Sequence, residues 1–172
     1  PLPLRLDLNQ SDFNGFQVTC PGGSDGWLQA LASGGKLPYK YSWSNGAQSE
    51  RPEGLPAGVF TCTVTDNSGC TATASASLSE PPALVFRAEF TNPGCAGYNS
   101  GIIRITSAAG GVTPYAYSLS DGPFTDQILY ENLWYGPYTL RIQDINGCDA
   151  DTSSVLQKPL IPEIILSPDV TV

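Results

Sequence analysis

The segment LPAGVFTCTVTDNSGC, residues 55–70, decides the fold class of this chain. Apolar and polar residues alternate from Phe60 to Thr65, so every second side chain can face a core while the others face water. The segment closes on aspartate, asparagine, serine and glycine, which favour a tight turn between two strands. No window of the chain shows a convincing helical period. The pattern therefore predicts an all-β, antiparallel structure.

The same segment returns 78 residues later as LWYGPYTLRIQDINGC, residues 133–148. Two earlier pieces are also repeated. Residues 20–26 match residues 95–101, and residues 34–42 match residues 110–118. About a dozen positions match in order, and the insertions fall between the matched pieces. The chain is therefore predicted to contain two copies of one unit.

Proline clusters mark where each copy ends. We expect the first β-sandwich repeat over residues 1–82, the second over residues 83–159, and a linker with the first strand of a following repeat over residues 160–172. Several short strands separated by turn residues, in about 75 residues per copy, predict tandem immunoglobulin-like antiparallel β-sandwich domains. Two such domains joined by proline-stiffened linkers would make a short rod within a longer array.

Composition and charge exclude several functions. The chain has 16 acidic and 8 basic residues, a formal net charge of −8, and no histidine. Without histidine the chain cannot by itself build a Ser-His-Asp or Cys-His nucleophile or a histidine-ligated zinc site. The acidic excess disfavours nucleic acid and anionic membranes, and no apolar stretch is long enough for membrane insertion. We expect no enzyme activity, no catalytic residues and no cofactor.

The five cysteines occupy three kinds of position. Cys62 stands where the second copy has Leu140, so we expect a small, buried, free thiol there. The other four cysteines occupy two equivalent positions in each copy. Such a pattern in a Ser/Thr-rich β-protein predicts structural disulfides and an extracellular or cell-surface location.

Two connectivities are open for these four cysteines. The preferred pairing stays within each copy and joins Cys20 to Cys70 and Cys95 to Cys148. The alternative joins Cys20 to Cys148, because in a seven-stranded domain the turn after the first strand and the turn before the last lie at opposite ends. The number of strands decides between the two pairings, and the sequence does not determine it.

A calcium-stiffened adhesion repeat is one alternative function. Oxygen ligands are plentiful in an acidic chain, and the weak candidates are Asp25, Asp66, Asp144 and Asp149. No residue is assigned to a metal, because no calcium-loop motif is present and because Asp66 and Asp144 also fit hairpin-turn chemistry.

A binding module for glycans or a protein partner, attached to a secreted multidomain enzyme, is the other alternative. Most aromatic residues have strand neighbours that predict a place in the core. Trp134 and Tyr135, replaced by Pro56 and Ala57 in the first copy, are the candidates for a surface contact.

The order of short motifs, which is the same in both copies, resembles the SprB repeat of surface proteins in the Bacteroidetes. The motifs are Cys-x-Gly-x-x-x-Gly, Gly-Gly-x-x-Pro-Tyr-x-Tyr-Ser, Leu-x-x-Gly-x-Tyr/Phe-Thr and Asp-x-x-Gly-Cys, over residues 20–81 and 95–159. Phe60 replaces the usual tyrosine and Cys62 the usual valine. The resemblance implies a large, repetitive adhesin or filament exported by the type IX route, as in gliding motility. Neighbouring repeats, surface glycans or other copies of the chain would be its partners.

Overall fold

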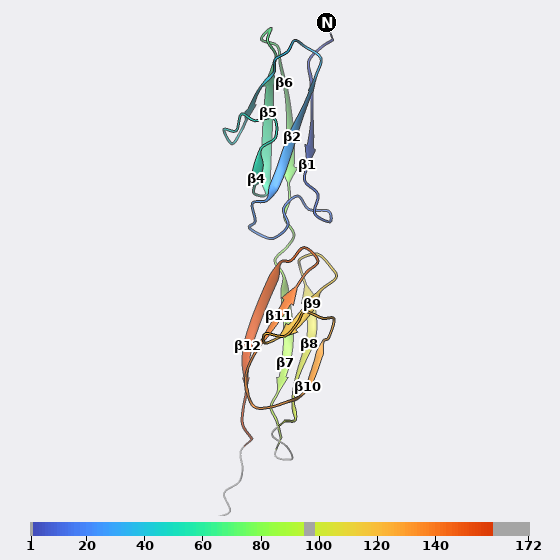
Figure 1. Cartoon of the computed structure of the whole chain (residues 1–172), viewed down its shortest axis with the longest axis vertical. Coiled ribbons are helices and arrows are strands. Elements are labelled where there is room, and N and C mark those ends of the chain that lie inside the picture. Colours follow the sequence, from blue (N-terminus) through green and yellow to red (C-terminus); the bar gives the residue numbers. More distant parts are fainter. Residues whose placement is uncertain (1, 95–98, 160–172) are drawn as a thin grey trace, which may run out of the picture. The chain divides into compact units, whose positions relative to one another are not determined.

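The computed structural model describes residues 2–94 and 99–159, and none of these residues is helical (Figure 1). No membrane-spanning helix therefore occurs in this part of the chain. The strand expected over residues 160–172 lies outside the described residues. Two compact units divide the chain. Unit 1 comprises Pro1–Val85, Ala109–Tyr115 and Gln143–Asp149, and unit 2 comprises Phe86–Ala108, Ala116–Ile142 and Ala150–Val172.

The strands of the first copy form two three-stranded sheets in unit 1. One sheet has the order β1-β2-β4, made of Arg5–Gln10, Gly26–Ser33 and Glu53–Leu55. The other has the order β3-β5-β6, made of Lys40–Trp43, Gly58–Thr65 and Thr71–Leu78. All four neighbouring pairs are antiparallel. The predicted all-β sandwich architecture is confirmed.

The core of unit 1 lies between these two sheets. Strand β5 shows the predicted alternation, because Phe60, Cys62 and Val64 are buried while the threonines between them are partly exposed. The same core cluster takes side chains from both sheets: Leu28, Ala30, Trp43, Leu55 and Leu78. On the outer face, Thr61 shares a hydroxyl hydrogen bond of 2.9 Å with Ser75. The period-two pattern thus separates an apolar core from a hydroxyl-rich surface.

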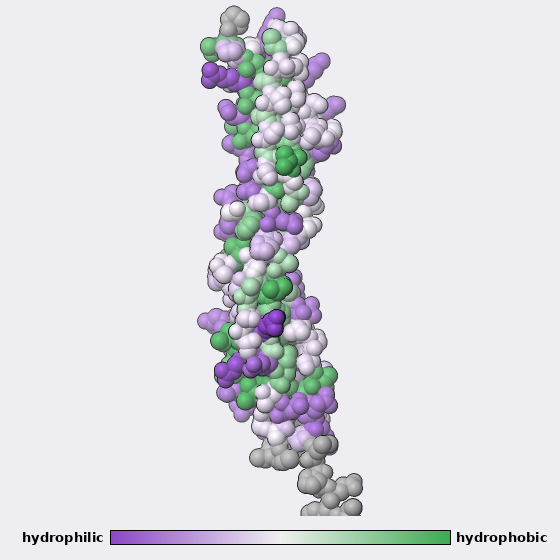
Figure 2. Space-filling model, turned by 180° about the vertical axis from the view of Figure 1, so that it is seen from behind, coloured by the Kyte–Doolittle hydropathy of each residue, from purple (hydrophilic) through white to green (hydrophobic). Residues whose placement is uncertain are grey.

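Unit 2 has the same plan. Its sheets have the orders β10-β8-β7 and β12-β11-β9. The strands are β7 (Val85–Thr91), β8 (Gly101–Ala109), β9 (Ala116–Leu119), β10 (Leu129–Leu133), β11 (Gly136–Gln143) and β12 (Asp149–Leu156). Buried aliphatic side chains from three of these strands form its core: Ile103, Ile105, Leu140, Ile142 and Leu156. Figure 2 shows apolar residues interspersed with polar ones on the face that it draws.

The two ends of strand β6 carry different parts of the first copy. At its start, the turn Asp66–Cys70 connects β5 to β6, and Asp66 and Cys70 are joined by a backbone hydrogen bond of 2.9 Å. Just after its end, the Ser79 carbonyl accepts hydrogen bonds from the N–H groups of Gln17 and Val18. The loop that contains Cys20 is therefore anchored at the end of β6 that lies opposite Cys70.

Candidate functional site

The turn between β11 and β12 is organised around one buried carboxylate. Asp144 is only 5% exposed. Its Oδ1 accepts hydrogen bonds from the N–H groups of Asn146 and Cys148, at 3.0 and 2.9 Å. Its Oδ2 accepts the N–H of Val112 at 2.8 Å. This Asx-type turn fixes the backbone from which the Cys148 side chain projects.

Gly111 is required beside this carboxylate. Its φ is +55°, a left-handed conformation that side chains disfavour. A Cβ atom at this position would lie 2.7 Å from Oδ2 of Asp144. The Gly-Gly motif of the repeat therefore lets the backbone approach the aspartate of the turn closely enough for the Val112 hydrogen bond.

The loop that contains Cys20 is held on both sides of the cysteine. Before it, Thr19 donates from its N–H and its hydroxyl to the Asp25 carboxylate, at 3.1 and 2.6 Å. After it, the N–H of Gly22 donates to the Glu80 carboxylate at 2.8 Å. Burial alone would raise the pKa of Asp25, but the hydrogen bonds from Thr19 outweigh it and hold that pKa below its usual value. Cys20 thus lies on a loop with fixed flanks.

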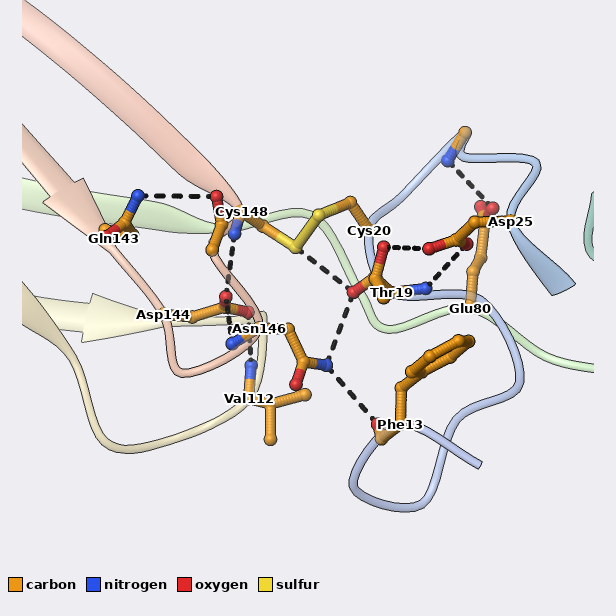
Figure 3. The surroundings of a disulfide bond; sticks show 12 residues. Phe13, Thr19, Cys20, Asp25, Glu80, Val112, Gln143, Asp144, Asn146 and Cys148 are labelled. Carbon is orange, nitrogen blue, oxygen red and sulfur yellow. Dashed lines mark hydrogen bonds between the residues drawn. A yellow bond between two sulfur atoms is a disulfide. The ribbon is translucent and has the colours of Figure 1, made fainter. Parts of the chain in front are cut away.

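Cys20 and Cys148 form a disulfide within unit 1 (Figure 3). Their Cα atoms are 5.5 Å apart and the residues are 128 positions apart in sequence. Cys148 is 6% exposed, and its Sγ lies 3.1 Å from the carbonyl oxygen of Thr19. Cys20 belongs to the first copy of the sequence repeat and Cys148 to the second. The bond therefore joins the two copies covalently.

Asn146 adds a polar contact next to the disulfide. Its Oδ1 accepts a hydrogen bond of 2.6 Å from Nδ2 of Asn14. Its Nδ2 donates to the carbonyl oxygens of Phe13 and Thr19, at 3.3 and 3.4 Å. Sequence reasoning missed this residue, because the first copy has Ser68 at the matched position and nothing in the repeat marks the difference as functional.

The preferred within-copy disulfide pairing is wrong. Strand β6, eight residues long, separates the end of the domain that holds Cys20 from the turn that holds Cys70. Eight extended residues span roughly 26 Å, whereas disulfide-bonded cysteines usually have Cα atoms less than about 7 Å apart. Cys70 is free and exposed, and Cys148 is bonded to Cys20 rather than to Cys95. The structure has the alternative pairing, and Cys95 lies outside the described residues.

Cys62 is free and buried, as predicted. It occupies a core position in β5 that corresponds to Leu140 in β11, and both side chains are completely inaccessible. Burial raises the pKa of the Cys62 thiol. A protonated thiol without solvent access is a weak nucleophile, so Cys62 is a core side chain.

Three of the four candidate calcium ligands, Asp25, Asp66 and Asp144, already serve as hydrogen-bond acceptors. Asp66 repeats the geometry of Asp144, and Asp25 is bonded to Thr19. Asp149 is the first residue of β12 and is exposed. Over residues 2–94 and 99–159, no three acidic, cysteine or histidine side chains gather into a group that could hold a metal ion. Calcium binding stays a prediction.

Trp134 and Tyr135 lie between β10 and β11 and are 58% and 45% exposed. The Trp134 carbonyl accepts a hydrogen bond from the Tyr138 hydroxyl, and the Lys158 ammonium lies 5.9 Å from the centre of the Tyr135 ring. Both rings are accessible to a ligand, and their role as a surface contact stays a prediction.

Comparison with protein families identifies the repeat. Two segments, residues 17–48 and 87–124, match the model of the SprB repeat. The first segment includes Cys20 and the loop around it, and the second includes the Gly-Gly motif next to Asp144. No curated protein matches the chain. The resemblance seen in the sequence is confirmed at these two segments, which are consistent with two tandem copies of the SprB repeat.

Proposed function

We propose that these two SprB repeats are a non-catalytic stalk segment of a large cell-surface adhesin or filament, in which a disulfide between consecutive repeats bears tension. The SprB repeat is a structural repeat associated with cell surfaces, which supports the adhesin part of the proposal. The observation that carries the mechanical part is the bond between Cys20 and Cys148.

The bond changes which part of the chain a pulling force can reach. A force applied before Cys20 and after Cys148 passes through the disulfide and bypasses the polypeptide between them. Strand β1 precedes the closed loop and β12 follows it, whereas β2 to β11 lie inside it. Only the two outer strands can be peeled away while the bond is intact. The proposed stalk therefore shields β2 to β11 from the pulling force.

The length protected in this way is large. The closed loop contains 128 residue steps, and an extended residue spans at most about 3.5 Å, so opening the bond would release roughly 450 Å of contour. A stalk that held its repeats together by non-covalent contacts alone could extend by that length when both domains unfolded. The disulfide therefore limits extension of the stalk without the need for a larger hydrophobic core in each domain.

The proposed location at the cell surface follows from the same bond. Disulfides form and persist in secreted and surface proteins and are uncommon in the reducing cytosol. Export by the type IX route and a role in gliding motility belong to the proposal through the family alone. Digestion of intact producing cells with an added protease, followed by immunoblotting for this segment, tests the location. Protection of the segment in intact cells would contradict it.

Single-molecule force spectroscopy tests the mechanical proposal. The full chain is held by handles at its two ends and stretched under oxidising and then reducing conditions. We expect the oxidised chain to release only the short segments outside the Cys20–Cys148 loop. After reduction we expect about 450 Å more contour length, because the force then acts on the polypeptide between Cys20 and Cys148.

A matched pair of variants distinguishes the effect of losing this disulfide from other effects of the reducing agent. Cys148→Ser should show the long extension even under oxidising conditions. Cys70→Ser, at the equivalent turn of the first copy, should behave like the unmodified chain, because Cys70 is free. Equal extension of the oxidised chain and the Cys148→Ser variant would overturn the proposal.

A further inference from the structure

The backbone around Cys70 repeats the backbone around Cys148. In each turn the aspartate Oδ1 accepts N–H groups two and four residues later, at 2.8 and 2.9 Å for Asp66 and 3.0 and 2.9 Å for Asp144. Each Oδ2 accepts one N–H from the Gly-Gly segment, from Lys36 at 3.0 Å and from Val112 at 2.8 Å. The two cysteines therefore lie in turns that have the same backbone hydrogen bonds. Each turn, together with the Gly-Gly segment that its aspartate binds, is here called a framework.

The strand that leads into each copy also joins this framework in the same way. The N–H of Gly35 donates to the Leu2 carbonyl at 2.9 Å, and the N–H of Gly111 donates to the Pro82 carbonyl at 2.8 Å. The Asn67 and Ile145 N–H groups donate to the carbonyls of Lys36 and Val112. The match thus extends over three separate chain segments in each copy.

The two frameworks differ in what covers them. The one around Cys148 is covered by the loop of residues 13–20, so that Cys148 is 6% exposed and Leu84 is 8% exposed. The one around Cys70 is open. Cys70 is exposed and free. Leu4, which contacts Gly35 as Leu84 contacts Gly111, is only partly buried.

We propose that the surface formed by Leu4, Gly35, Lys36, Asp66 and Cys70, here called the Cys70 surface, is a docking site for the Cys-x-Gly loop of a further repeat in the same polypeptide, with Cys70 as its disulfide partner. The occupant is inferred from the equivalent surface, where such a loop is seated and bonded through Cys20 to Cys148. The inference rests on the proposed stalk function. It extends that function from one disulfide between two repeats to a series of disulfides between successive repeats.

Two features of the Cys70 surface support this occupant. An exposed free thiol pairs readily in an oxidising environment, so a dedicated partner explains its presence in a surface protein. Leu4 provides apolar area that a seated loop would cover, since its counterpart Leu84 lies beside Cys20 and Cys148 and is 8% exposed. One contact is weaker than at Cys148, because Ser68 replaces Asn146 and has a shorter side chain to bond the loop carbonyls. Docking at Cys70 therefore depends more on the covalent bond.

The bond can form by thiol–disulfide exchange with a small disulfide such as oxidised glutathione. The loop cysteine first attacks the glutathione disulfide and forms a mixed disulfide, releasing one glutathione thiolate. The Cys70 thiolate then attacks the loop sulfur. The Cys70–loop bond forms, the mixed disulfide breaks, and the second glutathione leaves with the electron pair. Two protein thiols lose two electrons and two protons, which reduce one oxidised glutathione to two thiols.

A three-repeat chain tests the proposal directly. Residues 1–80 are added in front of the full chain, which places the Cys20 of the added copy 130 residues before Cys70, against 128 for the native pair. After oxidation in a glutathione buffer, the chain is digested without reduction and its disulfides are mapped by mass spectrometry. We expect two links, one from the added Cys20 to Cys70 and the native one from Cys20 to Cys148.

The control variant is Cys70→Ser in the same three-repeat chain, which should leave the added Cys20 free to alkylation and keep the native link. A native link together with a free, glutathione-bound or Cys70–Cys70 paired thiol in the parent three-repeat chain would overturn the docking proposal alone. Loss of the native link as well would overturn the proposed stalk function. The two failures are therefore distinguishable.

The added copy of the three-repeat chain could misfold, so a second test maps the disulfides of the intact polypeptide from the cells that produce it. Free thiols are alkylated at lysis and the protein is digested without reduction. The proposal expects the Cys70 peptide to be bonded to a peptide that contains a Cys-x-Gly sequence. Recovery of Cys70 as an alkylated thiol or bonded to a second molecule, with Cys20 bonded to Cys148, would refute it.

Discussion

Cys20 and Cys148 are 128 residues apart in sequence, yet their Cα atoms are 5.5 Å apart and their sulfur atoms are bonded. Each belongs to a different copy of the repeat, and each is set on a backbone held by carboxylates, Asp25 and Glu80 on one side and Asp144 on the other. The bond is therefore supported by local structure at both ends, and the following predictions depend on that arrangement.

Removal of the disulfide should lower the stability of the chain. On the chain-entropy model, a cross-link that closes a loop of this size stabilises the folded state by about 5 kcal/mol at most. We expect Cys148→Ser, and reduction of the unmodified chain, to lower the melting temperature measured by differential scanning calorimetry. Cys70→Ser should leave it unchanged. Identical melts of the oxidised chain and Cys148→Ser would show that the bond contributes no stability.

Asp144→Ala should destabilise the turn and slow formation of the disulfide. The substitution removes the acceptor of three backbone N–H groups, and a buried donor left without a partner costs about 1–3 kcal/mol. Urea unfolding measures the first effect, and the rate of thiol loss during oxidative refolding measures the second. Asp126→Ala, at an exposed position, is the control. An unchanged rate of thiol loss would show that the Asp144 turn does not promote formation of the disulfide.

Asp66 should make the stability of the chain depend on pH. Burial alone would raise the pKa of its carboxyl, but hydrogen bonds from the N–H groups of Cys70, Lys36 and Ser68 outweigh it and hold that pKa below its usual value. A lowered native pKa contributes stability that is present above the unfolded value of about 3.9 and is lost as pH falls through the native value.

Urea unfolding of the unmodified chain and of Asp66→Asn at a series of pH values checks this dependence. The variant should be less stable near neutral pH, and the difference should shrink as pH falls from about 5 to below the native pKa, since both side chains are then uncharged. A difference that stays constant over this range would show that the charge of Asp66 does not stabilise the fold.

Calcium should not change the melting of the chain under the stalk proposal. The carboxylates of Asp66 and Asp144 already accept backbone hydrogen bonds, and a cation would have to displace them. We expect calorimetric melts in excess chelator and in millimolar calcium to superimpose. A clear rise of the melting temperature with calcium, lost in an Asp25→Asn or Asp149→Asn variant, would favour the calcium-stiffened alternative.

The glycan-binding alternative makes a separate prediction at Trp134. If its exposed ring stacks on sugars, polysaccharides should quench the tryptophan fluorescence, and Trp134→Ala should abolish the quenching. Trp43, which is 3% exposed, supplies an internal background that a ligand does not reach. The stalk proposal expects no quenching in either protein. Saturable quenching that requires Trp134 would show that the second copy also binds a ligand.

Much of the fold could be predicted because it depends on local pattern. The alternation from Phe60 to Thr65 set which side chains are buried, since strand residues alternate between two faces whatever their partners. The turn residues Asp66 and Asp144 were also identified from local chemistry, because an aspartate bonds the backbone within a few residues of itself. The polar contact of Asn146 with Phe13 gave no such local signal, because it links residues 133 positions apart.

The sequence by itself determined that the chain is built from two copies of an antiparallel β-domain, that Cys62 is buried, and that the remaining cysteines occupy two equivalent positions in each copy. Only the tertiary structure decided which cysteines meet. That choice depends on which end of β6 each turn occupies, and so on the direction of every strand between them, a property that strand alternation does not encode. Because Cys20 and Cys70 lie at opposite ends of the same domain, the partner of Cys20 comes from the next copy.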